Sequence, residues 1–335
     1  MIEYHNGIHI KGTRLWLDAK RSADFSFVSH AHVDHAVRHR EILSTKETAR
    51  LYEHRFGKTK FNILEYNQPK RIEGTKVELF PSGHILGGAQ ILIEIGGVKI
   101  VYTGDFKLRV SLTAKKAEIK RCDILILEST FGLPRYAFPH PKDVHARMVE
   151  FVEDAQRRGE TPIFLAYTLG KAQEAMKILS NRGYKLSVHG TIYNIAKIYE
   201  EFGIKFKNWE HYQAENMEGR VLIVPPWAKK FRMIENIPRK RVAILTGWAL
   251  DSKAKDYFGV DEAIPLSDHA DFSELMEYVR KAQPQKVYTV HGFPEFVQFL
   301  QEAGFDAEPL KESTKVNTTF RKELLLNYDL FVSNY

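Results

Sequence analysis

The sequence predicts an α/β fold, and three observations support this prediction. Short apolar runs rich in Val, Ile and Leu, bounded by Gly, Pro or charged residues, have the character of buried strands. Between them lie stretches with apolar residues at helical spacing, so that strands and helices alternate. The length of 335 residues favours two domains over one. The predicted strands are 98–102, 124–127, 163–167, 221–224, 242–245 and 287–290, and the predicted helices are 171–180, 192–202 and 272–281.

Proline marks a candidate domain boundary. The segment 134–141 holds three prolines, which disfavour both helix interiors and central strands. A second boundary is expected near 251–261. No internal repeat or low-complexity tract is visible, so the chain is expected to consist of ordinary folded domains.

Composition limits the function classes. The formal net charge of +7 and pI of about 9.1 favour a polyanionic partner such as nucleic acid. No apolar run approaches the ~20 residues of a membrane span, and the first residues lack the pattern of a signal peptide. We therefore expect a cytoplasmic protein with no membrane partner.

Cys122 is the only cysteine, which excludes an internal disulfide. It stands in the largely apolar run 122–127 and is expected to be buried as a small hydrophobic residue. Any bound metal must therefore be held by histidine and carboxylate side chains. That donor set is typical of catalytic rather than structural zinc.

The strongest chemical signal is the segment 29–35, Ser-His-Ala-His-Val-Asp-His. In an extended segment His30 and His32 point the same way because side chains repeat with period two, so the pair can hold one ion. Asp34 and His35 then face a second position. The segment therefore favours a metal-dependent hydrolase, and a solvated polar loop is the alternative.

Further polar side chains follow predicted strands or stand in short polar turns, several of them beside glycine. His84, Asp105 and His291 each adjoin a glycine, which lets the backbone turn sharply or approach an ion closely. Glu128 and His269 stand in similar positions. Because loops at strand ends carry the sites of α/β folds, we expect these residues to gather at one edge of a sheet.

These residues resemble a known family. The pattern His30-x-His32-x-Asp34-His35, followed by His84 and Asp105, resembles the metallo-β-lactamase fold, and Asp18 in Leu-Trp-Leu-Asp matches its first motif. The resemblance implies an αββα sandwich. It covers nearly the whole chain, 12–308, while 311–335 carries no recognised motif.

The resemblance extends to the nucleic-acid-processing β-CASP branch, whose three motif positions are matched by Glu128, His269 and His291. Within it, 128–134 and 265–271 are similar to ligase-associated DNA exonucleases and archaeal mRNA 3′-end processing factors. This implies an inserted β-CASP α/β domain. The implied parts are a first metallo-β-lactamase segment 1–135, the insertion 136–261, and a second metallo-β-lactamase segment with a C-terminal tail, 262–335.

The resemblance also assigns metal ligands. It implies that His30, His32 and His84 hold one divalent ion, that Asp34, His35 and His291 hold a second, and that Asp105 bridges both. Imidazole and carboxylate donors suit Zn²⁺ as first choice, with Mn²⁺ as the alternative. Two such ions can lower the pKa of a shared water towards ~7.

The remaining site residues have supporting roles in this hypothesis. His269 is the candidate general acid, with Glu128 orienting its ring and favouring its protonated form. Asp18 either fixes a ligand histidine through its other ring nitrogen or caps a turn. Thr168, Gly170 and Lys171, at a strand-to-helix turn similar to one near the start of the insertion in pre-mRNA 3′-end endonucleases, are candidates for contacting a substrate phosphate.

The leading interpretation is a two-metal nuclease, an exonuclease acting on single-stranded DNA or RNA, with a homodimer compatible with the family. An RNA endonuclease of the 3′-end processing type is one alternative, and a small-ester or thioester hydrolase of the same parent fold is another. A non-catalytic binding subunit is disfavoured because every ligand position is filled. The sequence leaves DNA against RNA and exonuclease against endonuclease open.

Overall fold

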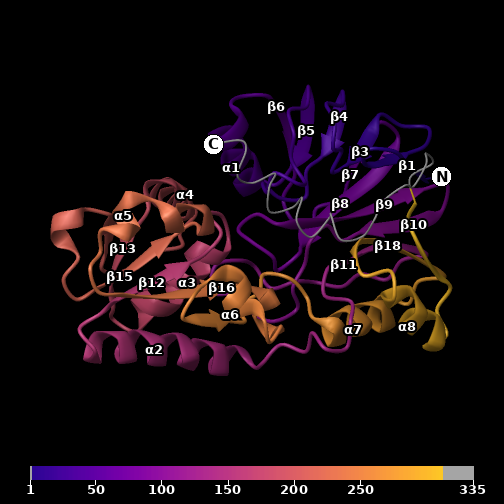
Figure 1. The fold of residues 1–335 in the computed structure, drawn as a ribbon. Helices are drawn as coiled ribbons and strands as arrows, with labels where there is room; N and C mark the ends of the chain where they lie inside the picture. Colours follow the sequence, from indigo (N-terminus) through magenta and orange to yellow (C-terminus); the bar gives the residue numbers. More distant parts are fainter. Residues whose placement is uncertain (1, 312–335) are drawn as a thin grey trace.

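The computed structural model describes residues 2–311, and its strands form three sheets. The first two sheets face each other, and the third lies to one side of them (Figure 1). The prediction that Cys122 is buried is confirmed. None of the helices in the described part of the chain has the length and apolar character that a membrane crossing requires.

The first sheet is built from short strands of the N-terminal part of the chain, in sequence order. Its outer face packs against helix α1 (Lys46–Phe56) through Ile42 and Tyr52. Its inner face contributes side chains such as Leu17 and Phe27 to a core shared with the second sheet. Its strands are β1 (Ile2–Tyr4), β2 (Ile8–Ile10), β3 (Leu15–Leu17), β4 (Phe25–Phe27), β5 (Glu41–Ser44) and β6 (Lys60–Ile63).

The second sheet has the order β19-β18-β11-β10-β9-β8-β7. Its inner face adds Leu79, Ile91 and Ile126 to the shared core, and its outer face is covered by α7 (Phe272–Ala282) and α8 (Phe296–Glu302). The layers are therefore helix, sheet, sheet, helix, which confirms the predicted αββα sandwich. The strands are β7 (Lys70–Ile72), β8 (Thr75–Pro81), β9 (Ala89–Ile95), β10 (Val98–Tyr102), β11 (Ile124–Ser129), β18 (Lys286–Gly292) and β19 (Ala307–Pro309).

The third sheet is wholly parallel, with the order β14-β13-β15-β12-β16-β17. Three helices cover one face, α2 (Pro141–Arg157), α3 (Lys171–Asn181) and α4 (Gly190–Glu201). The other face carries the short helices η2 (Pro226–Lys230), α5 (Arg232–Glu235) and α6 (Ala254–Phe258). The strands are β12 (Thr161–Leu165), β13 (Lys185–Val188), β14 (Trp209–His211), β15 (Arg220–Val224), β16 (Lys240–Leu245) and β17 (Glu262–Ile264), and η1 (Ala214–Asn216) and η3 (Gly247–Leu250) complete the elements.

The third sheet forms the predicted inserted α/β unit, because its strands lie between β11 and β18, which are neighbours in the second sheet. The insertion limits 136–261 stay a prediction, and the sheet itself runs from 161 to 264. The hydrophobic core under α3 and α4 continues into Ala31 and Ile85 of the sandwich. The sandwich and the inserted sheet therefore share a packed apolar junction. Of the predicted tail, 312–335 lies outside the described residues.

Candidate metal centre

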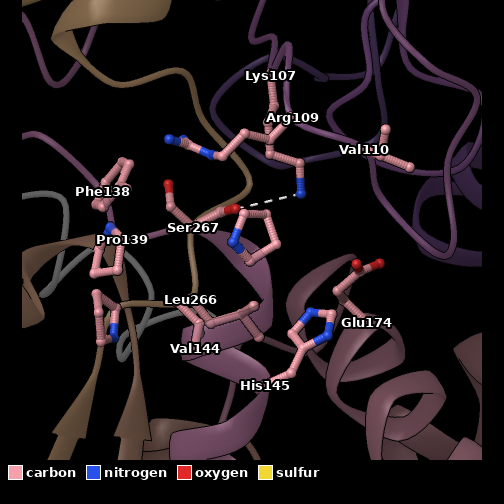
Figure 2. Close-up of a pocket in the computed structure, with 12 residues that line it drawn as sticks. Lys107, Arg109, Val110, Phe138, Pro139, Val144, His145, Glu174, Leu266 and Ser267 are labelled. Atoms are coloured by element: carbon pink, nitrogen blue, oxygen red, sulfur yellow. Dashed lines mark hydrogen bonds between the residues drawn. The ribbon is translucent and has the colours of Figure 1, made fainter.

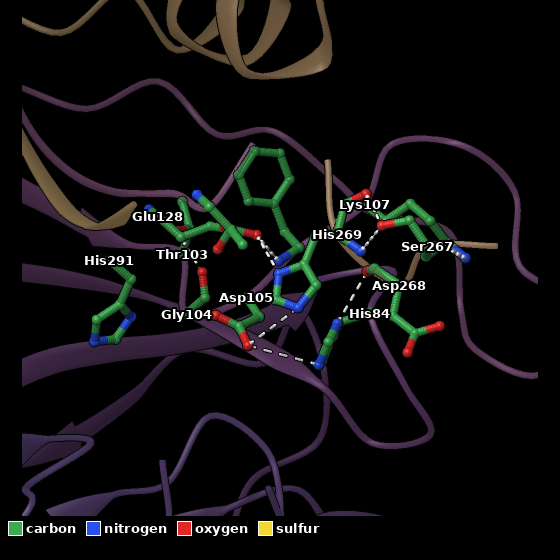
Figure 3. Close-up of polar contacts among 12 residues, drawn as sticks. His84, Thr103, Gly104, Asp105, Lys107, Glu128, Ser267, Asp268, His269 and His291 are labelled. Carbon is green, nitrogen blue, oxygen red and sulfur yellow. Dashed lines mark hydrogen bonds and ion pairs between the residues drawn. The ribbon is translucent and has the colours of Figure 1, made fainter. Parts of the chain in front are cut away.

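The candidate site lies at one edge of the αββα sandwich, where several strands end. His84, Asp105 and Glu128 follow or close β8, β10 and β11, which run in the same direction in the second sheet. The segment 30–35 follows β4 of the first sheet, and His269 follows β17. The structure thus brings together side chains that are widely separated in the sequence, as predicted from their positions after strands (Figure 3).

A local irregularity in the second sheet places His291. Val290 pairs with Glu128 and Gly292 pairs with Ser129, so His291 is the extra residue of a bulge in β18. Its φ of 49° lies in the left-handed region. A Cβ at Gly292 would lie 1.9 Å from the carbonyl oxygen of Ser129, so only glycine fits there. The bulge therefore depends on the His-Gly pair that the sequence presents.

The first group of candidate ligands is compact. Nδ1 of His32 lies 3.1 Å from Nε2 of His30 and 3.2 Å from Nε2 of His84. Oδ2 of Asp105 lies 3.5 Å from Nε2 of His30 and 3.7 Å from Nε2 of His84. All four donor atoms lie within 4.8 Å of one another, as a single ion would require.

The hydrogen bonds on the far side of these rings fix their tautomers. His32 donates from Nε2 to the carbonyl of Leu169 at 3.1 Å, and His84 donates from Nδ1 to the carbonyl of Asp268 at 2.9 Å. His30 contacts Oγ of Ser29 through Nδ1 at 2.9 Å. Since that hydroxyl donates to the Asp18 carboxylate at 2.5 Å, the ring nitrogen must be the donor.

The inward nitrogens of His30, His32 and His84 therefore carry lone pairs, and they face one another and a carboxylate. Burial lowers the pKa of all three imidazoles, that of His84 to about 3. Protonation of the rings therefore does not remove the repulsion between their facing lone pairs. Lone pairs and a carboxylate that converge in a buried site fit a bound cation. The donor set thus fits a divalent metal, with nitrogen and oxygen ligands and no thiolate.

The second group contains His35, Asp105 and His291. Nε2 of His35 lies 3.3 Å from Oδ1 of Asp105, and the rings of His35 and His291 are 5.2 Å apart between centroids. Asp105 therefore presents one oxygen to each group, which is the geometry expected of a bridging carboxylate. Burial disfavours a positive charge on His35. The nearby carboxylates of Asp105 and Asp34 outweigh burial and hold the pKa of His35 well above its usual value.

Among the predicted ligands, Asp34 is the one that lies outside the compact groups. Its Oδ2 is 3.8 Å from Nε2 of His35, but its side chain is 56% exposed and it does not belong to the compact group. The other six predicted ligands lie in the two compact groups, and that they bind ions stays a prediction. Asp34 stands at the rim, on the side of the second group.

Asp18 lies directly behind the histidines. Its carboxylate accepts hydrogen bonds from Nδ1 of His35 at 2.8 Å, from the hydroxyl of Tyr102 at 2.8 Å, and from the backbone and hydroxyl of Ser29. It contacts His35 directly and reaches His30 through Ser29. These contacts place Asp18 where it can orient His35 and His30 through their other ring nitrogen, and its role toward a metal stays a prediction.

Beside these two groups, His269 and Glu128 form with Asp105 a third group of side chains whose donor atoms lie close together. Nδ1 of His269 lies 3.1 Å from Oε1 of Glu128, and its Nε2 lies 4.0 Å from Oδ2 of Asp105 (Figure 3). Glu128 is fully buried and also accepts from the backbone amides of Phe106 and Thr130, which fix its orientation. Burial alone would lower the pKa of His269, but Glu128 and then Asp105 outweigh it and raise the pKa to about 9.

The predicted phosphate contacts at Thr168, Gly170 and Lys171 remain a prediction, and their groups have other partners in the structure. The amide of Gly170 donates to Oε1 of Gln173, whose Nε2 donates back to the carbonyl of Thr168. Nζ of Lys171 lies 3.2 Å from Oδ2 of Asp268. The turn is therefore occupied by its own contacts.

The structure also identifies residues near the site that sequence reasoning missed. Lys107 is almost fully buried and donates from Nζ to the carbonyl of Ser267 at 3.3 Å, beside a pocket between the sandwich and the inserted unit (Figure 2). Arg109 bonds Asp271 at 2.7 Å and the carbonyl of His269 at 3.2 Å. Both follow Asp105 closely in the sequence, but nothing in the sequence pairs them with the His269 segment.

The sequence is similar to those of known metallo-hydrolases and nucleases. Residues 262–313 match the family described as the Zn-dependent metallo-hydrolase RNA specificity domain. The chain is 35% identical to a probable DNA ligase of Opitutus terrae, over 96% of this chain but only 32% of that protein. It is 26% identical to an RNase J-like protein of Methanocaldococcus jannaschii, over 81% of this chain and 82% of that one.

One further relative and one solved structure extend the comparison. The RNase aCSPSF2 of Saccharolobus solfataricus is 25% identical over 70% of this chain and 56% of its own length. A crystal structure of a protein of unknown function from Enterococcus faecalis superposes with a TM-score of 0.60 and 16% identity, over 87% of this chain and 80% of that one, which concerns the fold alone. With its αββα sandwich, inserted parallel sheet and histidine-aspartate cluster, the chain is therefore similar to metal-dependent hydrolases of the metallo-β-lactamase fold that carry an inserted β-CASP domain.

Proposed function

We propose that this chain is a two-metal nuclease that hydrolyses phosphodiester bonds of single-stranded nucleic acid. The observation that carries the proposal is the His269–Glu128 pair, which stands 4.0 Å from the shared carboxylate of Asp105 but outside the four-residue first group. A phosphodiester leaves as an alkoxide unless it receives a proton. A protonated imidazole beside a metal centre is suited to supply that proton.

In this proposal His30, His32, His84 and Asp105 hold the first ion. His35, His291 and Asp105 hold the second, with Asp34 joining from the rim. Zinc is the first choice and manganese the alternative, because the donors are imidazole and carboxylate. When bound, the two ions would acidify a water and offset the negative charge on the phosphate oxygens.

The chain's own groups then have defined tasks. Hydrolysis adds a water oxygen to phosphorus and breaks one P–O bond. His269 gives its Nε2 proton to the departing oxygen, and Glu128 holds the ring with that proton facing Asp105. Asp18 keeps His35 and, through Ser29, His30 in the tautomers that present lone pairs to the ions.

Two observations support nucleic acid as the substrate. The net charge of +7 suits a polyanion, and the RNase J-like and aCSPSF2 relatives are named as RNases. We propose an exonuclease as the leading form, with an endonuclease of the RNA 3′-end processing type as the alternative. A soluble, cytoplasmic chain that can form a homodimer is part of the same proposal.

The test uses purified full-length chain with end-labelled single-stranded DNA and RNA of one sequence. We expect shortening of at least one oligonucleotide with Zn²⁺ or Mn²⁺ and none with a chelator. Gradual loss from one end identifies an exonuclease, and internal fragments identify an endonuclease. Hydrolysis of a thioester without any cleavage of either oligonucleotide would replace the proposal with the ester-hydrolase alternative.

A further inference from the structure

The turn that follows β12 brings the inserted sheet into contact with the candidate metal centre. The carbonyl of Leu169, in this turn, accepts the Nε2 hydrogen of His32 at 3.1 Å. The two residues are 137 positions apart in the sequence. A backbone group of the inserted unit therefore sets which nitrogen of His32 is free to bind an ion.

The same turn acts on a second ligand through an ion pair. Nζ of Lys171 lies 3.2 Å from Oδ2 of Asp268, and the two side chains are only 7% and 5% exposed. The backbone carbonyl of that same Asp268 accepts the Nδ1 hydrogen of His84 at 2.9 Å. Lys171 thus holds, from the inserted sheet, the peptide that orients His84.

Close packing leaves the turn little freedom to shift. Gly170 has a φ of +90°, and a Cβ there would lie 2.4 Å from Cγ2 of Ile85, the residue after His84. From the sandwich, Lys107 donates to the carbonyl of Ser267, the residue before Asp268 (Figure 2). The segment that orients His84 is therefore held by one cation from each part of the molecule.

The second group has its support elsewhere. His35 donates to Asp18, which lies beside the first sheet and also accepts from Tyr102 of the second. These contacts stay within the αββα sandwich. The two candidate metal positions therefore differ, because within residues 2–311 the hydrogen bonds to candidate ligands from the inserted unit, and from the Asp268 peptide that it holds, are made to the first group.

We propose that the turn Leu169–Gly170–Lys171 is a positioning element of the first metal group, so that metal affinity there depends on docking of the inserted sheet. This inference rests on the proposed metal site. A hydrogen-bond partner on the non-ligating nitrogen fixes the ring and raises its strength as a ligand, and loss of such a partner typically costs ~10–100-fold in affinity. Because coupling is reciprocal, a bound ion also stabilises the docked sheet.

A matched control is present in the chain. Arg50 of α1 and Glu201 of α4 form a two-bonded ion pair, at 2.9 Å for each bond, that also joins the sandwich to the inserted unit. Its side chains are 39% and 47% exposed, and neither is hydrogen-bonded to a candidate ligand. Loss of this exposed pair should change docking of the inserted sheet little, and it should leave the orientation of the candidate ligand histidines unchanged.

The experiment measures zinc affinity of the full-length chain by competition with a chromogenic chelator. In Lys171→Met we expect one zinc equivalent to bind ~10–100-fold more weakly, while the other keeps its affinity. Arg50→Met should bind both as the unmodified chain does. Lys171→Arg, which keeps the charge and the donor, should recover most of the loss.

A second pair of variants separates positioning from folding. Lys171→Met leaves the carboxylate of Asp268 buried and unpaired, which destabilises the fold by itself. Lys171→Met/Asp268→Asn removes both charges, so the metal-free melting temperature should recover while the zinc affinity stays low. Gly170→Ala, which pushes the turn away from Ile85, should weaken the same zinc equivalent.

The inference is overturned if Lys171→Met, Lys171→Met/Asp268→Asn and Gly170→Ala all bind both zinc ions with normal affinity. It is also overturned if Arg50→Met weakens zinc to the same extent. Because zinc binding is the readout, these results are independent of cleavage. A chain that shows the expected zinc pattern but cleaves no oligonucleotide would refute the proposed nuclease function and leave this inference standing.

Discussion

His269 and Glu128 form a buried pair in which Nδ1 of the imidazole lies 3.1 Å from a carboxylate oxygen, and this bond joins the loop after β17 to the end of β11. Glu128 has no exposed surface, and two backbone amides hold it in place. The ring is consequently fixed with Nε2 facing Asp105. In the proposed mechanism this pair supplies the proton, and it lies outside the two groups to which the metal ions are assigned.

His269→Ala should lower kcat by ~10²–10⁴-fold, the usual contribution of a positioned general acid. Zinc content should stay at the level of the unmodified chain, because His269 is not part of the four-residue first group or the His35 group. Single-turnover cleavage and metal analysis of the same sample measure both quantities. A variant that loses zinc together with activity would show that His269 is a ligand rather than the acid.

The pH dependence of cleavage should report the His269–Glu128 pair. Glu128 and Asp105 raise the pKa of His269 to about 9, so the protonated acid is present below that pH and is lost as the pH rises through it. Glu128→Gln keeps the shape but removes the charge, which lowers this pKa. The alkaline decline of kcat should therefore begin at a lower pH in the variant.

The measurement is kcat against pH at saturating substrate, with the acidic side of the profile as an internal reference.

The raised pKa of His269 also has a consequence for stability, with the same sign. Since the folded state raises the pKa of His269, its contribution to stability is complete below the ordinary value of ~6.5 and disappears as the pH rises through about 9. Superimposable profiles of kcat against pH for Glu128→Gln and the unmodified chain would count against the role assigned to Glu128, which is to raise the pKa of His269.

Much of this fold could be predicted because its central strands are continuous apolar runs. The expected strand 98–102 coincides with β10, and the expected helix 272–281 is α7 with one added residue. The first sheet was harder, because most of its strands have only three residues and carry little periodicity. The segment 134–141, predicted to be a domain boundary, ends where Pro141 opens α2 with His140 as its N-cap.

The candidate ligands were predictable because their types and spacings are chemically restrictive. The contacts behind them were not, since each joins positions far apart in the sequence. Contact of Lys171 with a substrate phosphate stays a prediction, whereas its pairing with Asp268, 97 positions later in the printed sequence, could not be predicted. A positive charge at a helix start carries no information about a carboxylate in the loop after β17, which is far away in the sequence.

Asp105→Ala should abolish binding of both zinc ions. One carboxylate oxygen lies 3.3 Å from His35 and the other 3.5 Å from His30, so both groups lose a donor together. His84→Ala is the matched comparison, because it removes a donor from the first group only and should leave one zinc bound. Metal analysis after gel filtration gives the stoichiometry, and two zinc ions in Asp105→Ala would exclude a bridging role.

Asp18→Asn should weaken zinc binding by ~10–100-fold without touching a ligand. Oδ2 of Asp18 accepts hydrogen bonds from Ser29, His35 and Tyr102. If the NH₂ group of asparagine took this position, it would face three other donors, and these would lose their acceptor. The metal-free chain should also lose about 1–3 kcal/mol of stability. Tyr102→Phe, which removes only one of these donors, should show a smaller loss of zinc affinity, and an equal loss would mean that the carboxylate does not act through the histidines.

Removal of metal should lower the melting temperature of the full chain. The inward lone pairs of His30, His32 and His84 are stabilised by a cation and repel one another without it. A ligand present at 1,000 times its Kd adds ~4 kcal/mol to folding, which corresponds to a shift of several degrees. Thermal unfolding with and without a chelator measures this shift, and Asp105→Ala should show none. Equal melting temperatures for the chelated and zinc-loaded chain would mean that the histidine cluster holds no ion, because a ligand that binds only the folded state must stabilise it.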